Sequence, residues 1–267
     1  MTQSAWVAAL LGVIEGITEY LPISSTGHLI IARQALGLPS GDAIDTFLIF
    51  IQAGSILGVC WHYRLRLVQA AAGCVRGKAS EMRFAALIAL ATIPAVILGV
   101  TLHSTIKLYL FSPLTVAGAL IVGGIAIIII ERLPLTDRTE SIEQMSWKLA
   151  LTVGLAQTLA LFPGVSRSAA TIMGGRLAGM SRRSATEFSF FLAIPVVFGA
   201  AGYDLYKNID ALAVTDAPFF AIGFCTAFVT TIITVRLLLA YIARYSFQAF
   251  GWYRIVVGTA VLGLFWN

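Results

Sequence analysis

Long runs without a charged residue alternate with short charged segments along the whole chain. The uncharged runs cover residues 46–61, 84–103, 108–130, 149–166, 188–203, 217–235 and 255–267. A helix needs about 20 apolar residues to cross a bilayer, and several of the runs reach that length. The runs lack the alternating polarity, in units of about ten residues, that a transmembrane β-barrel requires. The pattern therefore predicts an all-α polytopic membrane protein.

The composition excludes several other classes of protein. The chain has 267 residues, of which 58% are hydrophobic and only 12% are charged, whereas a soluble domain has about 25% charged residues. The net charge of +5 comes from basic residues between the apolar runs, which suits membrane topology and anionic headgroups better than nucleic acid. We therefore exclude an ordinary soluble enzyme, a disordered chain and a nucleic-acid-binding module.

The charges of the connecting segments predict how the chain is oriented in the membrane. Segment 62–83 has five basic residues and one acid, and segment 236–254 has three basic residues and no acid. Both are therefore predicted to be cytoplasmic, since basic loops stay on that side. Segment 204–216 has three acids and one base and is predicted to lie outside.

The cytoplasmic and outer positions of these three segments are mutually consistent only if residues 149–187 enter the membrane from the cytoplasm and return to it. By the same reasoning, residues 1–33 form a second hairpin that enters from the outer face. The expected fold therefore has about six transmembrane helices plus two re-entrant helical hairpins.

The turns of the two predicted hairpins are similar. Ser25 follows Pro22 by three residues, and Ser166 follows Pro163 by the same interval. The hairpins are predicted to run in opposite directions, which is typical of an inverted-topology repeat. We expect a single membrane domain over residues 1–267.

The repeat divides this predicted domain into two halves. They would span approximately residues 1–130 and 149–267 and be joined by a cytoplasmic loop at 131–148.

Two acids lie in apolar surroundings near the start of the chain. Glu15 and Glu19 are four residues apart, which would place them about 6 Å apart on one helix face. Acids within a membrane are costly and usually functional. The pair predicts either a site for a divalent cation, Mg²⁺ or Ca²⁺, which prefer oxygen ligands, or a pair that handles protons. The alternative is two interfacial acids at a helix end.

The first turn combines hydroxyls, a glycine and a histidine. Proline and glycine interrupt the helix there and free backbone N–H groups, which can bind anions. The candidate substrate-binding and catalytic residues of this turn are Ser24, Ser25, Thr26, Gly27 and His28. Since His28 follows Ser25 by one helical turn, the two could act as base and nucleophile. Alternatively, His28 attacks and the hydroxyls only bind, or the hydroxyls merely satisfy the local backbone.

The second turn carries Arg167, the sole charge within residues 149–175. A guanidinium at membrane depth needs an anionic partner, and its planar fork matches phosphate. Further hydroxyl donors for such an anion are Ser166, Ser168 and Thr171. The alternative is a structural ion pair with a glutamate, and Glu187 is a candidate to orient the guanidinium. Together, the two turns suit phosphoryl chemistry on a lipid, or transport of a phosphorylated or carboxylated anion.

Residues 15–29 and 163–171 resemble the two signature motifs of the undecaprenyl-diphosphate phosphatase family, the bacitracin-resistance proteins. Residues 187–195 and 204–207 resemble it further, so the similarity covers nearly the whole chain. The resemblance implies an inner-membrane homodimer that removes one phosphate from the C55 isoprenyl diphosphate carrier of cell-wall synthesis. It also implies a divalent-metal requirement, a pocket open to the periplasm, and competition with bacitracin for the substrate.

The family's site residues are carried over by position. Glu15 and Glu19 match the paired glutamates, Ser25 and His28 the serine and histidine, and Arg167 the essential arginine. Ser166 and Thr171 match positions beside that arginine.

The chain departs from the family pattern at Leu48. Many relatives have an acid directly after the phenylalanine that Phe47 matches, whereas the nearest acid here is Asp45. This departure puts any role for an acid on that helix in doubt.

The mechanism expected from these positions starts with attack by Ser25 on the terminal phosphorus, with His28 as base. Attack by His28 or by Ser166 is the alternative. The second candidate function is an isoprenyl-phosphate flippase or an anion transporter on the same scaffold.

Overall fold

The structure is a computed structural model that describes residues 4–38, 41–110, 112–208 and 216–265, with the side chains of residues 42, 102–110, 204 and 208 left out of the description. Part of the acidic segment 204–216 therefore lies outside the described residues.

The described chain is helical, and its only β-type pairing is an isolated bridge between Thr139 and Met180. The helices in chain order are α1 (Ala5–Thr18), α2 (Ser25–Ala35), α3 (Asp42–His62), α4 (Arg64–Val75), α5 (Ala79–Leu110), α6 (Pro113–Arg132), η1 (Ile142–Gln144), α7 (Trp147–Gln157), η2 (Thr158–Leu161), α8 (Arg167–Leu177), α9 (Arg182–Asn208), α10 (Ala217–Ile242) and α11 (Gln248–Phe265).

Six of the described helices are long and apolar enough to cross a membrane. They are α3, α5, α6, α9, α10 and α11, which correspond to the six crossings predicted from the apolar runs. The all-α polytopic fold is therefore confirmed. Helix α1 and the segment 147–161 are apolar but shorter.

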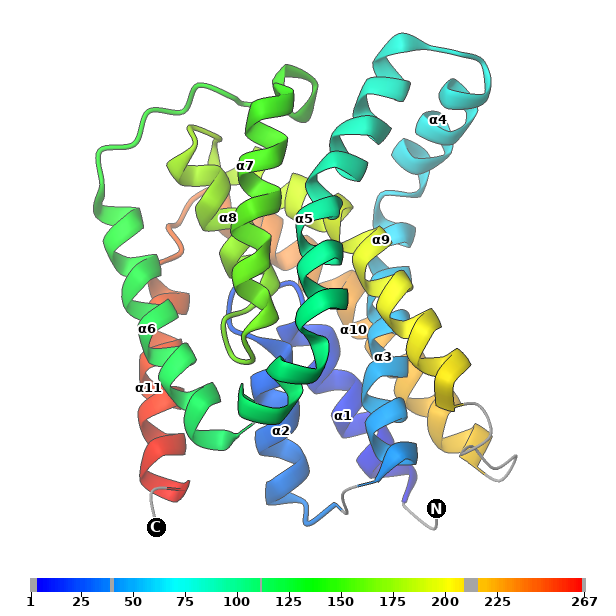
Figure 1. Ribbon diagram of the computed structural model, residues 1–267, viewed down its shortest axis with the longest axis vertical. Helices are drawn as coiled ribbons and strands as arrows, with labels where there is room; N and C mark the ends of the chain where they lie inside the picture. The colour runs from blue at the N-terminus through cyan, green and yellow to red at the C-terminus, as the bar shows by residue number, and fades with distance from the viewer. Residues whose placement is uncertain (1–3, 39–40, 111, 209–215, 266–267) are drawn as a thin grey trace.

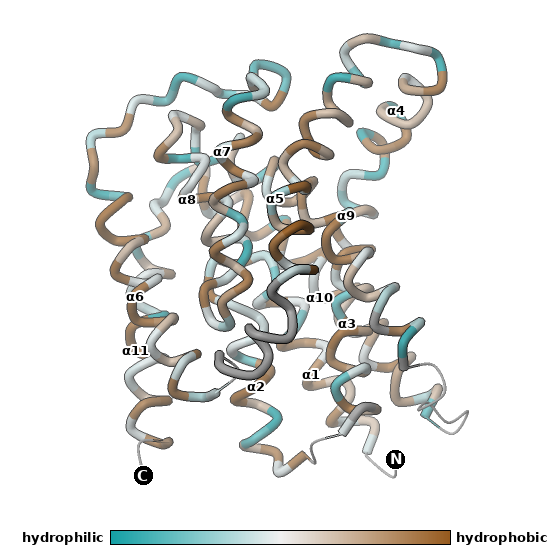
Figure 2. The backbone as a smooth tube through the Cα atoms, viewed as in Figure 1, coloured by the Kyte–Doolittle hydropathy of each residue, from teal (hydrophilic) through white to brown (hydrophobic). Residues whose placement is uncertain are grey.

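The connections between the helices gather at two ends of the molecule (Figure 1). The α6–α7 connection and the α4–α5 turn lie at the upper end of the view, and the start of α1 and the end of α11 lie at the lower end. Figure 2 shows hydrophilic residues along the upper connections and hydrophobic residues along the helices between the two ends. Segment 62–83, expected to be a loop, contains helix α4, whose Arg66 pairs with Glu81 of α5 at 2.6 Å.

Two helical hairpins meet at the centre of the molecule. The hairpin of α1 and α2 rises from the lower end in Figure 1, and the hairpin of α7, η2 and α8 descends from the upper end. Their turns touch, because Ser168 Oγ donates a hydrogen bond of 2.8 Å to the carbonyl oxygen of Leu21. This contact brings the two predicted anion-binding turns together. Their re-entry into a membrane and the inverted repeat stay predictions.

Buried charges tie several connections together at the upper end. Glu131, at the end of α6, is fully buried and accepts from Arg182 at 2.9 Å and from the backbone N–H of Phe247 at 3.1 Å. Arg176 of α8 lies 3.8 Å from Glu131 and also pairs with Asp137. The cluster fixes the base of the second hairpin to the ends of α6, α9 and α11.

Small residues allow α1 to pack closely against α10. A Cβ atom added at Gly12 would lie 2.0 Å from Thr226 Oγ1 and 2.4 Å from the carbonyl oxygen of Gly223. Close approach through small residues is the usual way in which helices pack within membranes. The position of α1 matters for function because this helix carries Glu15 and leads directly into Glu19.

We predict that Gly12→Ala destabilises the protein because the added methyl group overlaps α10. The expected loss is about 1–3 kcal/mol, seen as a lower melting temperature in detergent. Gly263→Ala on α11 is the matched control, because a Cβ there meets nothing within 4 Å and alanine is the better helix former. Equal melting temperatures for the two variants would show that α1 and α10 are not tightly packed.

Candidate active site

Both hairpin turns use the same backbone arrangement. Ser24 and Ser166, with φ angles of 75° and 72°, are the two non-glycine residues with positive φ in the described chain. Each caps the helix that follows, since Ser24 Oγ accepts from the N–H of Gly27 at 3.3 Å and Ser166 Oγ from the N–H of Ala169 at 3.2 Å. Such strained residues cluster at functional sites.

This arrangement corrects the correspondence expected from the sequence. By position after the proline, Ser25 was the counterpart of Ser166. By backbone conformation and capping, the counterpart is Ser24. The first turn has one residue fewer between its proline and the left-handed serine, so Ser25 and Arg167 occupy equivalent first positions of α2 and α8.

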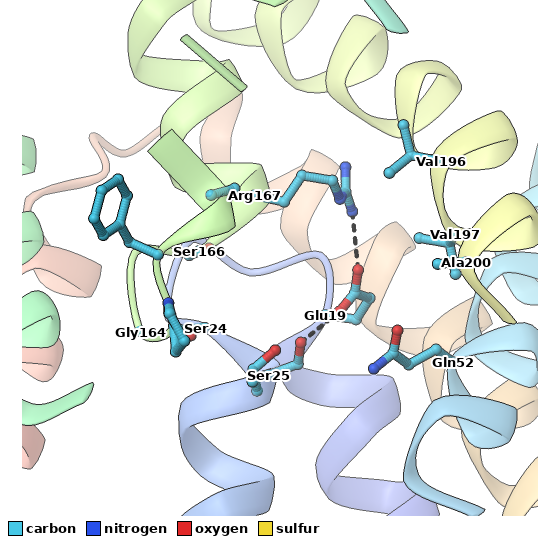
Figure 3. A pocket seen from close by; sticks show the side chains of 14 residues that line it. Glu19, Ser24, Ser25, Gln52, Gly164, Ser166, Arg167, Val196, Val197 and Ala200 are labelled. Atoms are coloured by element: carbon cyan, nitrogen blue, oxygen red, sulfur yellow. Dashed lines mark hydrogen bonds and ion pairs between the residues drawn. The ribbon is translucent and has the colours of Figure 1, made fainter. Parts of the chain in front are cut away.

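Glu19 connects the two turns. Its Oε2 accepts a hydrogen bond from Ser25 Oγ, and its Oε1 lies 3.2 Å from Arg167 Nη2 (Figure 3). The carboxylate thus lies between a hydroxyl of the first hairpin and the guanidinium of the second. Three of the predicted catalytic residues are therefore brought together.

Arg167 is held from several sides. Its Nη1 donates to the carbonyl oxygen of Ser189 on α9 at 2.9 Å, and its Cζ lies 5.6 Å from the centre of the Tyr20 ring. Its buried Nε has no hydrogen-bond partner within the described residues. The guanidinium is therefore oriented but retains a donor for a further acceptor.

The prediction that Glu187 orients the guanidinium of Arg167 is wrong. Glu187 Oε1 instead accepts from Arg183 Nε, one helical turn earlier on α9, at 3.0 Å. Ser189 takes the orienting position, and its Oγ also bonds Thr171 Oγ1 at 2.7 Å. Ser189 was hard to predict from the sequence, because a serine within an apolar helix is common and only its packing against α8 reveals the contact.

The predicted hydroxyls of the second turn have different environments. Ser166 lines a cavity, whereas Ser168 and Thr171 are fully buried and are not among the residues that line it. Ser168 bonds the backbone of the first hairpin, and Thr171 donates to the carbonyl oxygen of Arg167 at 2.8 Å. These two hydroxyls hold the turns in place.

The cavity between the turns has a volume of about 170 Å³. Figure 3 shows the polar side chains of Arg167, Glu19 and Ser25 near one another, with Val196, Val197 and Ala200 of α9 to one side of them. The residues that line it are Glu19, Ser24, Ser25, Thr26, Gln52, Ala160, Phe162, Pro163, Gly164, Ser166, Arg167, Val196, Val197 and Ala200. Gln52 of α3 was not predicted as a site residue from the sequence. The signal that could have identified it is a polar amide in the middle of the apolar run 46–61.

His28 lies apart from the cavity lining. Its Nδ1 is 2.7 Å from the carbonyl oxygen of Ser24, and its Nε2 is 2.8 Å from the hydroxyl of Tyr253 on α11, whose ring it stacks against. Both ring nitrogens are thus engaged. The expected pairing of His28 with Ser25 is absent, because the hydroxyl of Ser25 bonds Glu19 instead.

Glu15 lies one turn before Glu19, as predicted, and is fully buried. Neither of its carboxylate oxygens has a hydrogen-bond partner in the described part of the chain. Within the described residues there is no group of three or more His, Cys, Asp and Glu side chains that could hold a metal alone. Carboxylate oxygens are ligands of the kind that a hard cation such as Mg²⁺ takes together with phosphate and water, but Glu15 does not line the cavity and both oxygens of Glu19 are engaged by Ser25 and Arg167.

The acid near Leu48 is not part of this site. Asp45 pairs with Arg33 at 2.6 Å, which links α3 to α2 at the lower end of the first hairpin. The doubt raised by the family pattern therefore leaves the central residues unaffected.

The chain is similar to known proteins over nearly its whole length. The family model described as bacitracin resistance protein BacA matches residues 8–260. A protein of Aromatoleum aromaticum named undecaprenyl-diphosphatase is 50% identical over 96% of this chain and 93% of its own length. Proteins of the same name from Ectopseudomonas mendocina and Nitrosospira multiformis are 49% and 50% identical, over 97% and 95% of this chain and 93% and 92% of their own lengths. The chain therefore belongs to the bacitracin resistance protein BacA family.

Proposed function

We propose that this protein is an undecaprenyl-diphosphate phosphatase, an enzyme that hydrolyses the C55 isoprenyl diphosphate to the monophosphate and inorganic phosphate. The observation that carries the proposal is the chain of contacts from Ser25 through Glu19 to Arg167 beside one cavity. It joins a nucleophile, a proton acceptor and an anion-binding group. The relatives that share nearly the whole chain are named for the same activity, and no observation favours a flippase.

Binding of the diphosphate relies on Arg167 and on the two turns. The guanidinium fork matches two phosphate oxygens. The first N–H groups of α2 and α8 have no partner within their helices, and such groups attract anions. The apolar wall formed by Val196, Val197 and Ala200 suits the start of the isoprenyl chain.

Ser25 is the proposed nucleophile and Glu19 its base. The Oγ of Ser25 attacks the terminal phosphorus while its proton moves to Glu19, to which it is already hydrogen-bonded. The bond between that phosphorus and the bridging oxygen breaks, and the isoprenyl monophosphate leaves with the electron pair. Water then hydrolyses the phosphoserine, releases inorganic phosphate and restores the hydroxyl. Arg167 stabilises the charge on the transferred oxygens throughout.

A divalent cation, Mg²⁺ or Ca²⁺, would be held by Glu15 and Glu19. The two unpartnered and buried oxygens of Glu15 support this assignment. When bound, the cation would neutralise negative charge on the phosphate oxygens. Glu15 would act as a ligand only, and the roles of Ser25 and Arg167 would be unchanged.

We place the protein in the bacterial inner membrane, with its cavity open to the periplasm and bacitracin competing for the lipid substrate. The charge distribution supports the orientation of the chain in the membrane, because the basic segments 62–83 and 236–254 are expected on the cytoplasmic side. A homodimer is the proposed assembly by analogy with the family. The cell-wall role follows from the undecaprenyl carrier that the relatives are named for.

The proposed function predicts phosphate release without a sealed membrane. Purified protein in detergent should release inorganic phosphate from C55 diphosphate, since hydrolysis needs one compartment and transport needs two. A chelator should abolish the release, and added Mg²⁺ or Ca²⁺ should restore it. Absence of hydrolysis in detergent, together with uptake of the intact lipid in vesicles, would favour the transporter instead.

Arg167→Lys should lower kcat/KM by about 100-fold or more, because a point charge cannot replace the two parallel hydrogen bonds of the fork. Arg183→Lys is the control, since Arg183 is an exposed arginine that pairs with Glu187 away from the cavity. Near-normal turnover in Arg167→Lys would remove this residue from phosphate binding.

Ser25→Ala should eliminate any phospho-enzyme that acid quenching traps after incubation with substrate labelled in its terminal phosphate. Ser146→Ala, which alters the capping serine of α7, should leave the label unchanged. Label that persists in Ser25→Ala would move the nucleophile to Ser166 or His28. Mass spectrometry of the labelled peptide would then identify which of them carries it.

A further inference from the structure

Arg254 is a second buried arginine close to the hairpin turns. The charge pattern placed it in a cytoplasmic loop with other basic residues, but α11 begins at Gln248, so Arg254 lies within the helix. Its exposed fraction is 0%, and within the described residues no carboxylate pairs with it. A buried guanidinium normally requires such a partner, so its position calls for another explanation.

Backbone carbonyl groups from three separate segments surround this guanidinium. Its Nη1 donates to Pro22 at 3.2 Å and to Val165 at 2.9 Å. Its Nη2 donates to Gly164 and to Ala119, each at 3.0 Å. A fifth bond, of 3.3 Å, joins Nε to the carbonyl oxygen of Leu120. One side chain therefore binds both hairpin turns and helix α6.

These bonds also fix the direction of a peptide group next to the site. A trans peptide is planar, with its C=O and N–H pointing in opposite directions, and the described chain contains no cis peptide. The carbonyl of Val165 points to Arg254, so the N–H of Ser166 in the same peptide points away from it. Ser166 lines the cavity and immediately precedes Arg167. Arg254 thus sets the orientation of the backbone from which Arg167 projects.

We propose that Arg254 is a positioning residue that holds the two hairpin turns in register. It would keep Ser25 and Glu19 of the first hairpin aligned with Arg167 of the second. This inference rests on the proposed phosphatase function and deepens it. Displacement of the guanidinium should lower kcat far more than it changes KM, because alignment of the reacting groups is lost while the binding groups remain.

Gly123 of α6 offers a way to displace Arg254 without altering its charge or any residue of the cavity. A Cβ atom at Gly123 would lie 2.2 Å from Nη2 and 2.8 Å from Cζ of Arg254. Gly118 lies on the same helix, and a Cβ there meets nothing within 4 Å. Gly123→Ala should therefore lower kcat by about 100-fold, as expected when reacting groups are displaced by about 1 Å. Gly118→Ala should retain the wild-type kcat.

Arg254→Lys provides a second and independent variant. Its ammonium keeps the positive charge but cannot span five carbonyl groups in three segments. We expect a fall in kcat similar to that of Gly123→Ala. Arg176→Lys is the matched control, because Arg176 is also buried but pairs with acids at the base of the second hairpin. It controls for the general cost of an arginine-to-lysine change in a buried position.

A double-mutant cycle separates positioning from general weakening of the fold. If Arg254 acts through the alignment of Arg167, Gly123→Ala should lower kcat much less in an Arg167→Lys background than in the wild type. Independent effects would instead multiply. A multiplicative result, or a wild-type kcat in folded Gly123→Ala and Arg254→Lys, would overturn the proposal.

Amide hydrogen exchange tests the same idea without any activity measurement. Peptides that cover the turns at 19–26 and 162–168 should exchange faster in Arg254→Lys than in Arg176→Lys, while peptides of α3 and α10 should not differ. If wild-type protein released no phosphate but this exchange pattern were seen, the proposed phosphatase function would be wrong. The proposal that Arg254 holds the two hairpin turns together would still be supported. If Arg254→Lys and Gly123→Ala both failed to fold while Arg176→Lys folded, Arg254 would be a folding residue and the positioning role would be lost.

Discussion

The ion pair between Glu19 and Arg167 is the interaction on which the arrangement of the site depends. The two side chains come from hairpins that approach from opposite ends of the molecule. Both side chains are almost fully buried, and a buried charge is costly without a partner, so each side chain stabilises the charge of the other. The contact therefore couples the fold to the site, because Glu19 and Arg167 join the two turns and also line the cavity.

The two hairpin turns have the same local structure. Each reverses the chain at a left-handed serine whose Oγ caps the next helix, and each thereby presents a helix N-terminus to the centre of the molecule. The first residue of each helix then carries the reactive group, Ser25 in one and Arg167 in the other. This similarity supports the predicted inverted repeat, although the two halves contribute different groups: the first supplies the Ser25 hydroxyl and the glutamates, and the second supplies the Arg167 guanidinium.

Features that depend on local pattern were predictable from the sequence. The apolar runs gave the six candidate spans, and the isolated charge of Arg167 marked a buried anion-binding turn. Features that depend on neighbours distant in sequence were not. The expected partner of Ser25 was His28, three residues away, but the imidazole faces Tyr253 on α11 and Glu19 takes its place. Arg254 was predicted to lie in a cytoplasmic loop because it follows other basic residues in the same segment of the chain. Only the position at which α11 begins shows that Arg254 lies within a helix.

The two arginines beside the hairpin turns, Arg167 and Arg254, differ in how their charge is balanced, and this difference explains how one site can be both rigid and open to a substrate. Arg167 is paired with a carboxylate beside a cavity, and a phosphate can replace that carboxylate because both are anions that suit the same fork. Arg254 is surrounded by carbonyl groups of the backbone, which cannot leave without unfolding the turns. An incoming diphosphate therefore competes for the guanidinium of Arg167 while the scaffold held by Arg254 stays fixed. Exchange of partners at Arg167 would also release Glu19 from the ion pair at the moment when Ser25 needs a base.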